Sequence, residues 1–191
     1  MLTRKASKTS NRLRDRFDNV TIAFHWLSVL LVVVQLASGW WVERGDTYAA
    51  TLLWLHRSSG AMFFVIVVLR ILWRLGKGAR VGHPSHMPVW QQYAAQGNAY
   101  ALYAILLVQL GTGMGDVLFR GKAFTLFTVS VPALVERDKV AHLMLHAIHA
   151  VSAWCLLALI VMHVAAAAYH GIILRDGVVQ KMLPGRSDPV G

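Results

Sequence analysis

The chain has 191 residues, of which 56% are hydrophobic and only 15% are charged, and its formal net charge is +10. Soluble domains carry about 25% charged residues, so this composition excludes an ordinary soluble domain and indicates an integral membrane protein. The positive charge does not indicate nucleic-acid binding, because the basic residues lie between hydrophobic segments rather than in one continuous basic patch.

Four apolar stretches follow one another along the chain, and each approaches the roughly 20 residues that a membrane-spanning helix needs. They cover residues 20–42, 51–73, 97–118 and 140–174. We therefore predict an all-α integral membrane four-helix bundle over residues 20–174, preceded by a basic cytoplasmic segment, residues 1–19, and followed by a cytoplasmic tail, residues 175–191. The last stretch exceeds one bilayer crossing, so we expect its helix to project into water at one or both ends.

The basic residues are distributed unevenly over the connections between these stretches. Those before the first stretch, after the second and after the fourth have few acidic neighbours, and they are Arg4, Lys5, Lys8, Arg12, Arg14, Arg16, Arg74, Lys77, Arg80, Arg175, Lys181 and Arg186. The other two connections balance their basic residues with acids: Arg44 with Glu43 and Asp46, then Arg120, Lys122, Arg137 and Lys139 with Glu136 and Asp138. Because cytoplasmic loops are enriched in Lys and Arg, both termini and the loop between the second and third stretches should be cytoplasmic.

Four histidines lie inside the apolar stretches at matching depths. His25 lies near the cytoplasmic end of the first stretch, and His56 lies near the outer end of the second. The fourth stretch carries His149 and, 14 residues later, His163; on a helix these are about 21 Å apart and on nearly the same face. The sequence therefore predicts an outer pair, His56 with His149, and an inner pair, His25 with His163, which two bis-histidine haems would need.

The chemistry of these histidines favours a role as metal ligands over a role in helix packing. A buried histidine is often a hydrogen-bonded residue between helices, but ionisable groups at membrane depth are costly and usually functional. A haem iron held by two imidazoles suits one-electron transfer. The second ring nitrogen of each ligand needs a partner of its own, for which backbone carbonyls and the nearby Ser28, Ser59 and Ser152 are candidates.

Five further histidines are assigned other roles. His170 lies on the same seven-residue stripe as His149 and His163, and its depth makes it an alternative partner for His25. The roughly 31 Å of helix between His149 and His170 would hold two irons too far apart, so His163 is favoured. We interpret His142, His146 and His170 as interfacial residues near haem propionates or a quinone headgroup, and we assign no ligand role to His83 and His86.

Several local motifs resemble the bacterial cytochrome b561 family of di-haem membrane cytochromes. They are Phe24-His25-Trp26, His56-Arg57-Ser58-Ser59-Gly60, the pair Arg70 and Arg74, and the last-stretch segment that runs from His149 through Met162-His163 to Tyr169-His170. One departure is that family members often carry a histidine after the glycine that opens the third span, whereas Asn98 follows Gly97 here.

This resemblance implies two haems b, held by the four paired histidines, in a multi-pass protein of the bacterial inner membrane. It implies electron transfer between an outer donor and the quinone pool, with membrane lipid and quinone as partners. One version is an oxidoreductase similar to superoxide oxidases, with ubiquinone as substrate; another is a haem b subunit that anchors a dehydrogenase or hydrogenase and docks a redox protein partner. A homo-oligomer, with a second copy of the chain as partner, is a further alternative. A histidine-lined metal or proton transporter is a more distant alternative, because Asp116 is the only acid near a span interior.

The remaining features have two interpretations each. Arg57 at the outer end, and Arg70 and Arg74 at the inner end, could neutralise haem propionates. The alternative for Arg57 is a position in a solvated loop, and the alternative for Arg70 and Arg74 is contact with lipid phosphates. The glycines of Gly111-Thr112-Gly113-Met114-Gly115 could make room for a porphyrin or for close helix packing. The single cysteine, Cys155, is expected to be a small buried residue.

Overall fold

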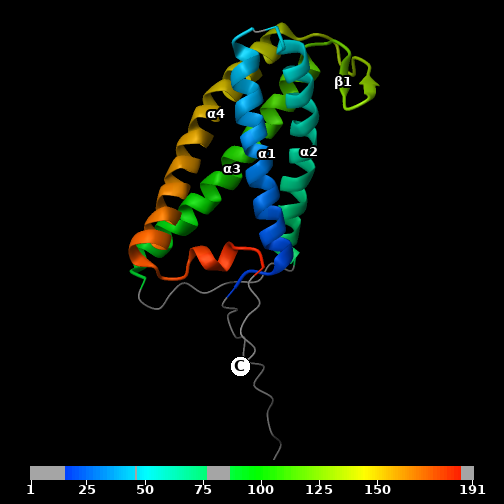
Figure 1. The fold of residues 1–191 in the computed structure, drawn as a ribbon. Coiled ribbons are helices and arrows are strands. Elements are labelled where there is room, and N and C mark those ends of the chain that lie inside the picture. Colours follow the sequence, from blue (N-terminus) through cyan, green and yellow to red (C-terminus); the bar gives the residue numbers. More distant parts are fainter. Residues whose placement is uncertain (1–15, 46, 77–86, 186–191) are drawn as a thin grey trace, which may run out of the picture.

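The computed structural model describes residues 16–45, 47–76 and 87–185, and within these the chain forms four long helices. The helices are α1 (Asn19–Glu43), α2 (Ala49–Gly76), α3 (Val89–Phe119) and α4 (Lys139–Ala168) (Figure 1). All four are long and apolar enough to cross a membrane. The predicted all-α membrane four-helix bundle is therefore confirmed.

The two ends of the bundle differ in what they carry. At one end, here called the terminal end, α1 begins and the chain leaves α4 for its C-terminus (Figure 1). At the other, the hairpin end, a short β-hairpin joins α3 to α4: β1 (Phe124–Leu126) pairs antiparallel with β2 (Val129–Val131). His25 and His163 lie toward the terminal end, and His56 and His149 toward the hairpin end.

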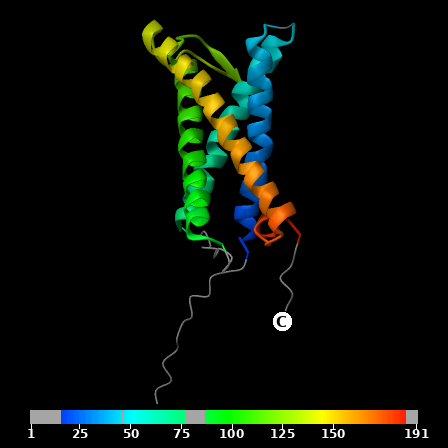
Figure 2. The same cartoon turned by 90° about the vertical axis from the view of Figure 1, so that its left-hand side faces the viewer.

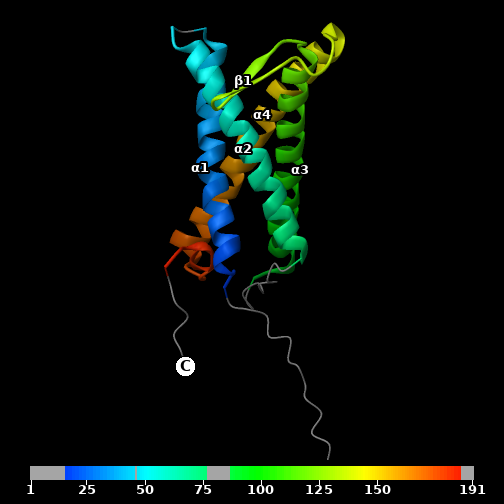
Figure 3. The ribbon, with the colours of Figure 1, turned by 90° about the vertical axis from the view of Figure 1, so that its right-hand side faces the viewer.

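The helices pack mainly as two antiparallel pairs, α1 with α2 and α3 with α4. Figure 2 shows α4 running obliquely, from beside α3 at the hairpin end toward α1 at the terminal end. Figure 3 shows the opposite side, where α2 crosses from beside α1 at the hairpin end toward α3 at the terminal end. The oblique course of α4 brings it toward α1, the helix that carries His25, at the terminal end.

The buried core is small, as expected for a bundle whose outer surface meets lipid. Its members come from all four helices and are Leu31, Phe63, Val67, Leu106, Leu110 and Leu156. Five serines in α1, α2 and α4 are also buried, and they are Ser28, Ser38, Ser58, Ser59 and Ser152. Cys155 is exposed on the outer surface of α4, so the expectation of a buried cysteine is wrong.

Helix α3 begins eight residues before the predicted start of its apolar stretch, at Val89 rather than residue 97. Pro88 precedes it, and the carbonyl of Pro88 accepts from the backbone N–H groups of Gln91 and Gln92. Hydropathy identifies only the apolar part of a helix, whereas these polar turns satisfy their own backbone hydrogen bonds and extend beyond it.

The hairpin was not predicted, because each of its strands has only three residues and carries little periodicity. It docks on α2 through two hydrogen bonds at Phe127. The Nε1 of Trp54 donates to the Phe127 carbonyl (2.7 Å), and the Phe127 N–H donates to the Ser58 hydroxyl (2.8 Å). The hairpin therefore lies over α2 within two residues of His56.

The segment after α4 turns back toward the start of α1. Residues Tyr169–Leu174 form a π-helical turn and residues Val179–Met182 a 3-10 turn. The Nε1 of Trp26 then donates to the carbonyl of Met182 (2.8 Å), and Arg16 donates to the carbonyl of Leu183 (2.7 Å). The chain that follows the last apolar stretch is therefore bound to the start of α1.

Candidate haem site

The structure brings the four predicted histidines together in the predicted pairs. The ring centroids of His56 and His149 are 6.1 Å apart, and those of His25 and His163 are 6.3 Å apart. A metal ion bound by two imidazoles from opposite sides, each through a bond of about 2.0 Å, holds the ring centroids roughly 6 Å apart. Both separations therefore fit an iron between the two rings.

His56 is oriented by Ser38 of α1. The Ser38 hydroxyl donates its single hydrogen to the carbonyl of Val34 (2.6 Å), so its oxygen is left to accept a hydrogen bond from His56 Nδ1, which lies 3.0 Å away. A proton on Nδ1 leaves the lone pair of Nε2 free for a metal ion, and the hydrogen bond fixes the orientation of the ring. Ser38 thus has the role for which other serines were candidates.

His149 is oriented by the backbone of α3. Its Nδ1 lies 2.9 Å from the carbonyl of Gln109, which can only accept, so this nitrogen also carries the proton. The Nε2 accepts from the side-chain amide of Gln109 (3.1 Å), whose oxygen in turn accepts from the Ser152 hydroxyl. A backbone-carbonyl partner was predicted, whereas Ser28, Ser59 and Ser152 form no hydrogen bond with the four rings.

Two glycines make room for the hairpin-end pair. A Cβ on Gly113 would lie 2.8 Å from Cε1 of His149, closer than carbon atoms normally approach, and one on Gly39 would lie 3.2 Å from Cε1 of His56. By contrast, a Cβ on Gly111 would meet nothing within 4 Å. Gly113 thus leaves space for a side chain of the neighbouring helix α4, which fits the helix-packing alternative predicted for these glycines.

The terminal-end pair has different partners. The guanidinium of Arg70 lies 3.4 Å from Nδ1 of His25, and the side-chain amide nitrogen of Asn98 lies 3.4 Å from Nδ1 of His163. The oxygen of the same Asn98 amide is buried and has no hydrogen-bond partner among the described residues. Asn98, in the position where the sequence departs from the family pattern, therefore lies next to a predicted ligand.

The three predicted propionate-binding arginines lie beside the pairs. Arg70 and Arg74 both lie against the ring of Tyr103, with their Cζ atoms 5.2 and 5.5 Å from its centroid. At the hairpin end, Arg57 is half-buried within electrostatic range of Arg120 and Asp116. The Nε atoms of Arg57 and Arg70 are buried without a hydrogen-bond partner among the described residues, so both guanidiniums retain donors for an anionic group.

The other described histidines form acid pairs at the two ends of the bundle. His142 Nδ1 lies 2.5 Å from a carboxylate oxygen of Asp116, a buried residue that also pairs with Arg120 at 3.2 Å, and His146 Nδ1 lies 3.9 Å from the same carboxylate. His170 Nδ1 lies 2.5 Å from Asp176, so the structure brings His163, and not His170, to His25. His83 and His86 lie outside the described residues.

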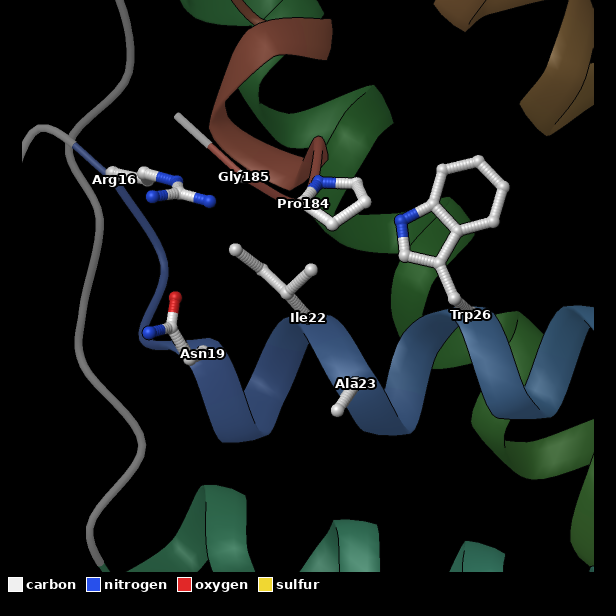
Figure 4. Close-up of a pocket in the computed structure, with 7 residues that line it drawn as sticks. All are labelled: Arg16, Asn19, Ile22, Ala23, Trp26, Pro184 and Gly185. Atoms are coloured by element: carbon white, nitrogen blue, oxygen red, sulfur yellow. The ribbon is translucent and has the colours of Figure 1, made fainter. Parts of the chain in front are cut away.

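A pocket of about 470 Å³ lies at the terminal end, between α1 and the returning C-terminal segment (Figure 4). Its walls are mostly apolar, with Ile22, Ala23 and Pro184 among them, and Arg16 and Asn19 lie at one end. Trp26 forms another wall, and the centroid of its ring is 5.6 Å from that of His25 in an edge-on arrangement. The pocket is therefore one aromatic ring away from the terminal-end pair.

Comparison with known proteins identifies the family of this chain. The sequence model of the prokaryotic cytochrome b561 family matches residues 16–185. The chain belongs to this family. It is therefore a multi-pass bacterial membrane cytochrome that carries haem b and transfers electrons.

Three relatives indicate the range of proteins that this cytochrome resembles. Cytochrome b561 homolog 2 of Escherichia coli strain K12 is 29% identical over 184 residues, which cover 93% of this chain and 96% of the relative. A probable superoxide oxidase, CybB of Yersinia pestis, is 26% identical over 178 residues, covering 90% and 98%. The probable Ni/Fe-hydrogenase 1 B-type cytochrome subunit of E. coli strain K12 is 22% identical over 207 residues, covering 88% of each chain.

The fit of the histidines to haem b is better than their fit to a bare metal ion. Among the described residues, no group of three or more His, Cys, Asp or Glu side chains lies close enough to hold a metal ion. The donor sets consist instead of two imidazoles each, with an arginine nearby, which suits an iron whose remaining ligands come from a porphyrin with acidic propionates.

The sequence pointed to Gly113 and Asn98 without placing them beside the histidines, and Ser38 and Gln109 were missed altogether. Gln109 could have been noticed, because a polar side chain inside an apolar stretch is costly unless it has a partner or a function. Ser38 could not, since small residues are common in membrane helices for packing reasons alone.

Proposed function

We propose that this cytochrome binds two haems b, one between His56 and His149 and one between His25 and His163, and passes single electrons between them. The observation that supports the proposal is the pair of ring separations, 6.1 and 6.3 Å, at the two ends of the bundle. The Nδ1 hydrogen bonds of His56 and His149 hold these rings in the tautomer that presents Nε2 to a metal ion.

Bound haem would supply the one-electron iron couple, and the chain's own residues would bind and orient it. Arg57 would donate to a propionate at the hairpin end, and Arg70 and Arg74 at the terminal end, which frees His25 from its contact with Arg70. His25, His56 and His149 are half-buried in the bundle, and two imidazoles per iron would favour outer-sphere electron transfer over binding of small ligands.

Replacing single histidines tests the assignment. His56→Ala or His149→Ala should lose the hairpin-end haem, and His25→Ala or His163→Ala the terminal-end haem, because each change removes one axial ligand from one iron. Pyridine haemochrome assays should give two haems per native chain and one per variant, whereas His142→Ala and His170→Ala, the controls, should keep two. A native value of one, or loss of haem only in the control variants, would contradict the assignment.

We further propose that the cytochrome lies in the bacterial inner membrane with its terminal end in the cytoplasm, and that it delivers electrons to the quinone pool. The basic residues of the terminal connections support this orientation. The pocket beside Trp26 is the described site that best suits a quinone, because its apolar walls can hold an isoprenoid tail and the amide of Asn19 at one end can donate to a carbonyl oxygen of the quinone ring (Figure 4).

The electron donor has two candidate classes. The similarity to a probable superoxide oxidase supports a small anionic donor at the hairpin end and a quinone-linked oxidoreductase acting alone. The similarity to a hydrogenase cytochrome subunit supports the alternative, a membrane anchor that receives electrons from a docked redox protein. Purified chain in detergent distinguishes them: quinone reduction on addition of superoxide alone favours the first, and dependence on a co-purified dehydrogenase or hydrogenase favours the second.

A further inference from the structure

We propose that Asn98 is the positioning residue of His163: its side-chain oxygen accepts the hydrogen bond from Nδ1–H of that imidazole and thereby tunes the terminal-end haem. The inference rests on the proposed ligand role of His163. It assigns a role to the polar residue that follows Gly97 on α3, and it concerns only the terminal-end pair.

The first support comes from the geometry of the two side chains. Asn98 of α3 and His163 of α4 face each other with 3.4 Å between Asn98 Nδ2 and His163 Nδ1. An imidazole that binds iron through Nε2 carries its proton on Nδ1 and needs an acceptor there. A half-turn of the Asn98 amide exchanges its nitrogen and oxygen with little change in shape, and it places the acceptor beside that proton.

The second support is the state of the amide oxygen. Asn98 Oδ1 is buried and has no hydrogen-bond partner among the described residues. A buried acceptor without a partner costs about 1 to 3 kcal/mol as a general rule. The half-turn brings this oxygen to Nδ1–H of His163, so the acceptor that lacked a partner and the ring proton satisfy each other.

The hairpin-end pair provides the comparison. There, Nδ1 of His149 donates to the Gln109 carbonyl and Nδ1 of His56 to the Ser38 hydroxyl, so both rings have an acceptor. At the terminal end the neighbour of His25 is the guanidinium of Arg70, which only donates. Asn98 is therefore the described side chain placed to give the terminal-end haem an imidazole with an acceptor on Nδ1.

An acceptor on Nδ1–H makes the imidazole a stronger electron donor and stabilises ferric iron over ferrous iron. Removing it in Asn98→Leu, which keeps the approximate size, should raise the midpoint potential of the terminal-end haem. Asn98→Asp, a stronger acceptor, should lower it. We expect up to about a tenfold change in the equilibrium constant for reduction, which is about 59 mV for a one-electron couple.

The experiment is a potentiometric titration of purified full-length protein, combined with low-temperature EPR of the ferric haems. Gln96→Leu removes an exposed amide two residues earlier on α3 and is the matched control. Opposite shifts in the Leu and Asp variants, with a changed EPR signal from one haem only and an unchanged hairpin-end potential, support the proposal. An unchanged terminal-end potential and EPR signal in Asn98→Leu, with both haems bound, overturns it.

A failure of this proposal can be distinguished from a failure of the proposed haem ligands. If His163→Ala keeps both haems, the ligand assignment fails, whatever Asn98 does. If Asn98→Leu loses the terminal-end haem altogether, Asn98→Asp decides: retention of haem with a lowered potential supports the hydrogen bond, whereas loss in both variants shows that Asn98 serves packing and overturns the proposal.

Discussion

At the scale of single residues, the site depends on small side chains that control the position of large ones. Ser38 fixes the ring of His56 through one hydrogen bond, and the absence of a side chain at Gly113 leaves space for the ring of His149. Neither residue could bind haem itself. Ser38 keeps the proton of His56 on Nδ1, so that its Nε2 can bind iron, and Gly113 lets the ring of His149 keep its position.

Gly113→Ala should disturb the hairpin-end haem selectively. Its Cβ would lie 2.8 Å from Cε1 of His149, so the ring must move away from its position. We expect about half of the haem to be lost, with the terminal-end haem retained. Haem content per chain and the difference spectrum measure this effect.

Gly111→Ala, one half-turn earlier on the same helix, is the matched control for Gly113→Ala. A Cβ there meets nothing within 4 Å, and alanine favours a helix by about 1 kcal/mol over glycine. Full haem content and equal or higher thermal stability are expected. Equal haem loss in both variants would show that the glycines matter for the helix and not for the ring.

At the scale of elements, α1 is capped by Asp18, whose carboxylate also accepts a hydrogen bond from α2. Asp18 accepts from the backbone N–H and the hydroxyl of Thr21 (2.9 and 2.7 Å) and from Nε1 of Trp73 (3.1 Å). Partial burial works against ionisation of this carboxyl, but the hydrogen bonds outweigh it, and the pKa of Asp18 is lowered from 3.8. The ionised form is therefore the one that stabilises the fold.

Asp18→Ala should destabilise the protein by about 1 kcal/mol, the usual value of an N-cap, which corresponds to roughly 2 to 4 °C in Tm for a chain of this size. Because the folded-state pKa is depressed, the contribution is fully present above pH 3.8 and is lost as the pH falls through the lower folded-state value. Thermal melts in detergent at neutral and acidic pH test this, with Glu136→Ala, an exposed acid, as control. A difference from wild type that persists unchanged at the lowest pH would contradict the role of the charge.

At the scale of the whole molecule, the two ends differ in their charges. At the terminal end, Arg70 lies close enough to His25 and His163 to act electrostatically on both, and Arg74 lies beside it. At the hairpin end, the acids Asp116 and Glu43 act on His149 and offset the nearby arginines. A field that is more positive at the terminal end favours the reduced form of the haem there.

We therefore expect two separate midpoint potentials, with the higher one at the terminal end, so that electrons pass downhill from the hairpin end. Arg70→Gln should lower the terminal-end potential and leave the hairpin-end potential unchanged, since a nearby cation stabilises the less positive ferrous haem. Potentiometric titration of the native chain and of His56→Ala, which retains only the terminal-end haem, assigns the two values. A higher potential at the hairpin end would contradict this electrostatic account.

The exposed basic residues of the hairpin-end loop are relevant to the identity of the electron donor. Lys122, Arg137 and Lys139 are exposed there, whereas Arg120 is held by Asp116. If superoxide is the donor, its reduction of haem should slow as ionic strength rises, because exposed charges are screened over about 8 Å at physiological salt. Lys122→Glu and Arg137→Glu should lower the second-order rate in stopped-flow measurements, and Lys181→Glu at the other end should not. A rate independent of salt would favour the docked-partner alternative.

The sequence by itself determined the number of helices, their approximate limits and the depths of the four histidines. Hydropathy is a local property, and a spacing of 14 residues on a helix fixes the relative height and face of His149 and His163 before any packing is known. Pairing by depth then follows from the order of the spans alone, and the structure brings together the rings that this order predicts.

Only the tertiary structure decided which groups surround those rings. The acceptor on His56 comes from α1, the acceptor on His149 and the amide beside His163 come from α3, and Gly113 acts on a residue of a different helix. It also placed Cys155 on the outer surface and the hairpin over α2. These contacts depend on the crossing and rotation of whole helices, which are set by packing between many side chains and leave no periodic signal in the sequence of any one helix.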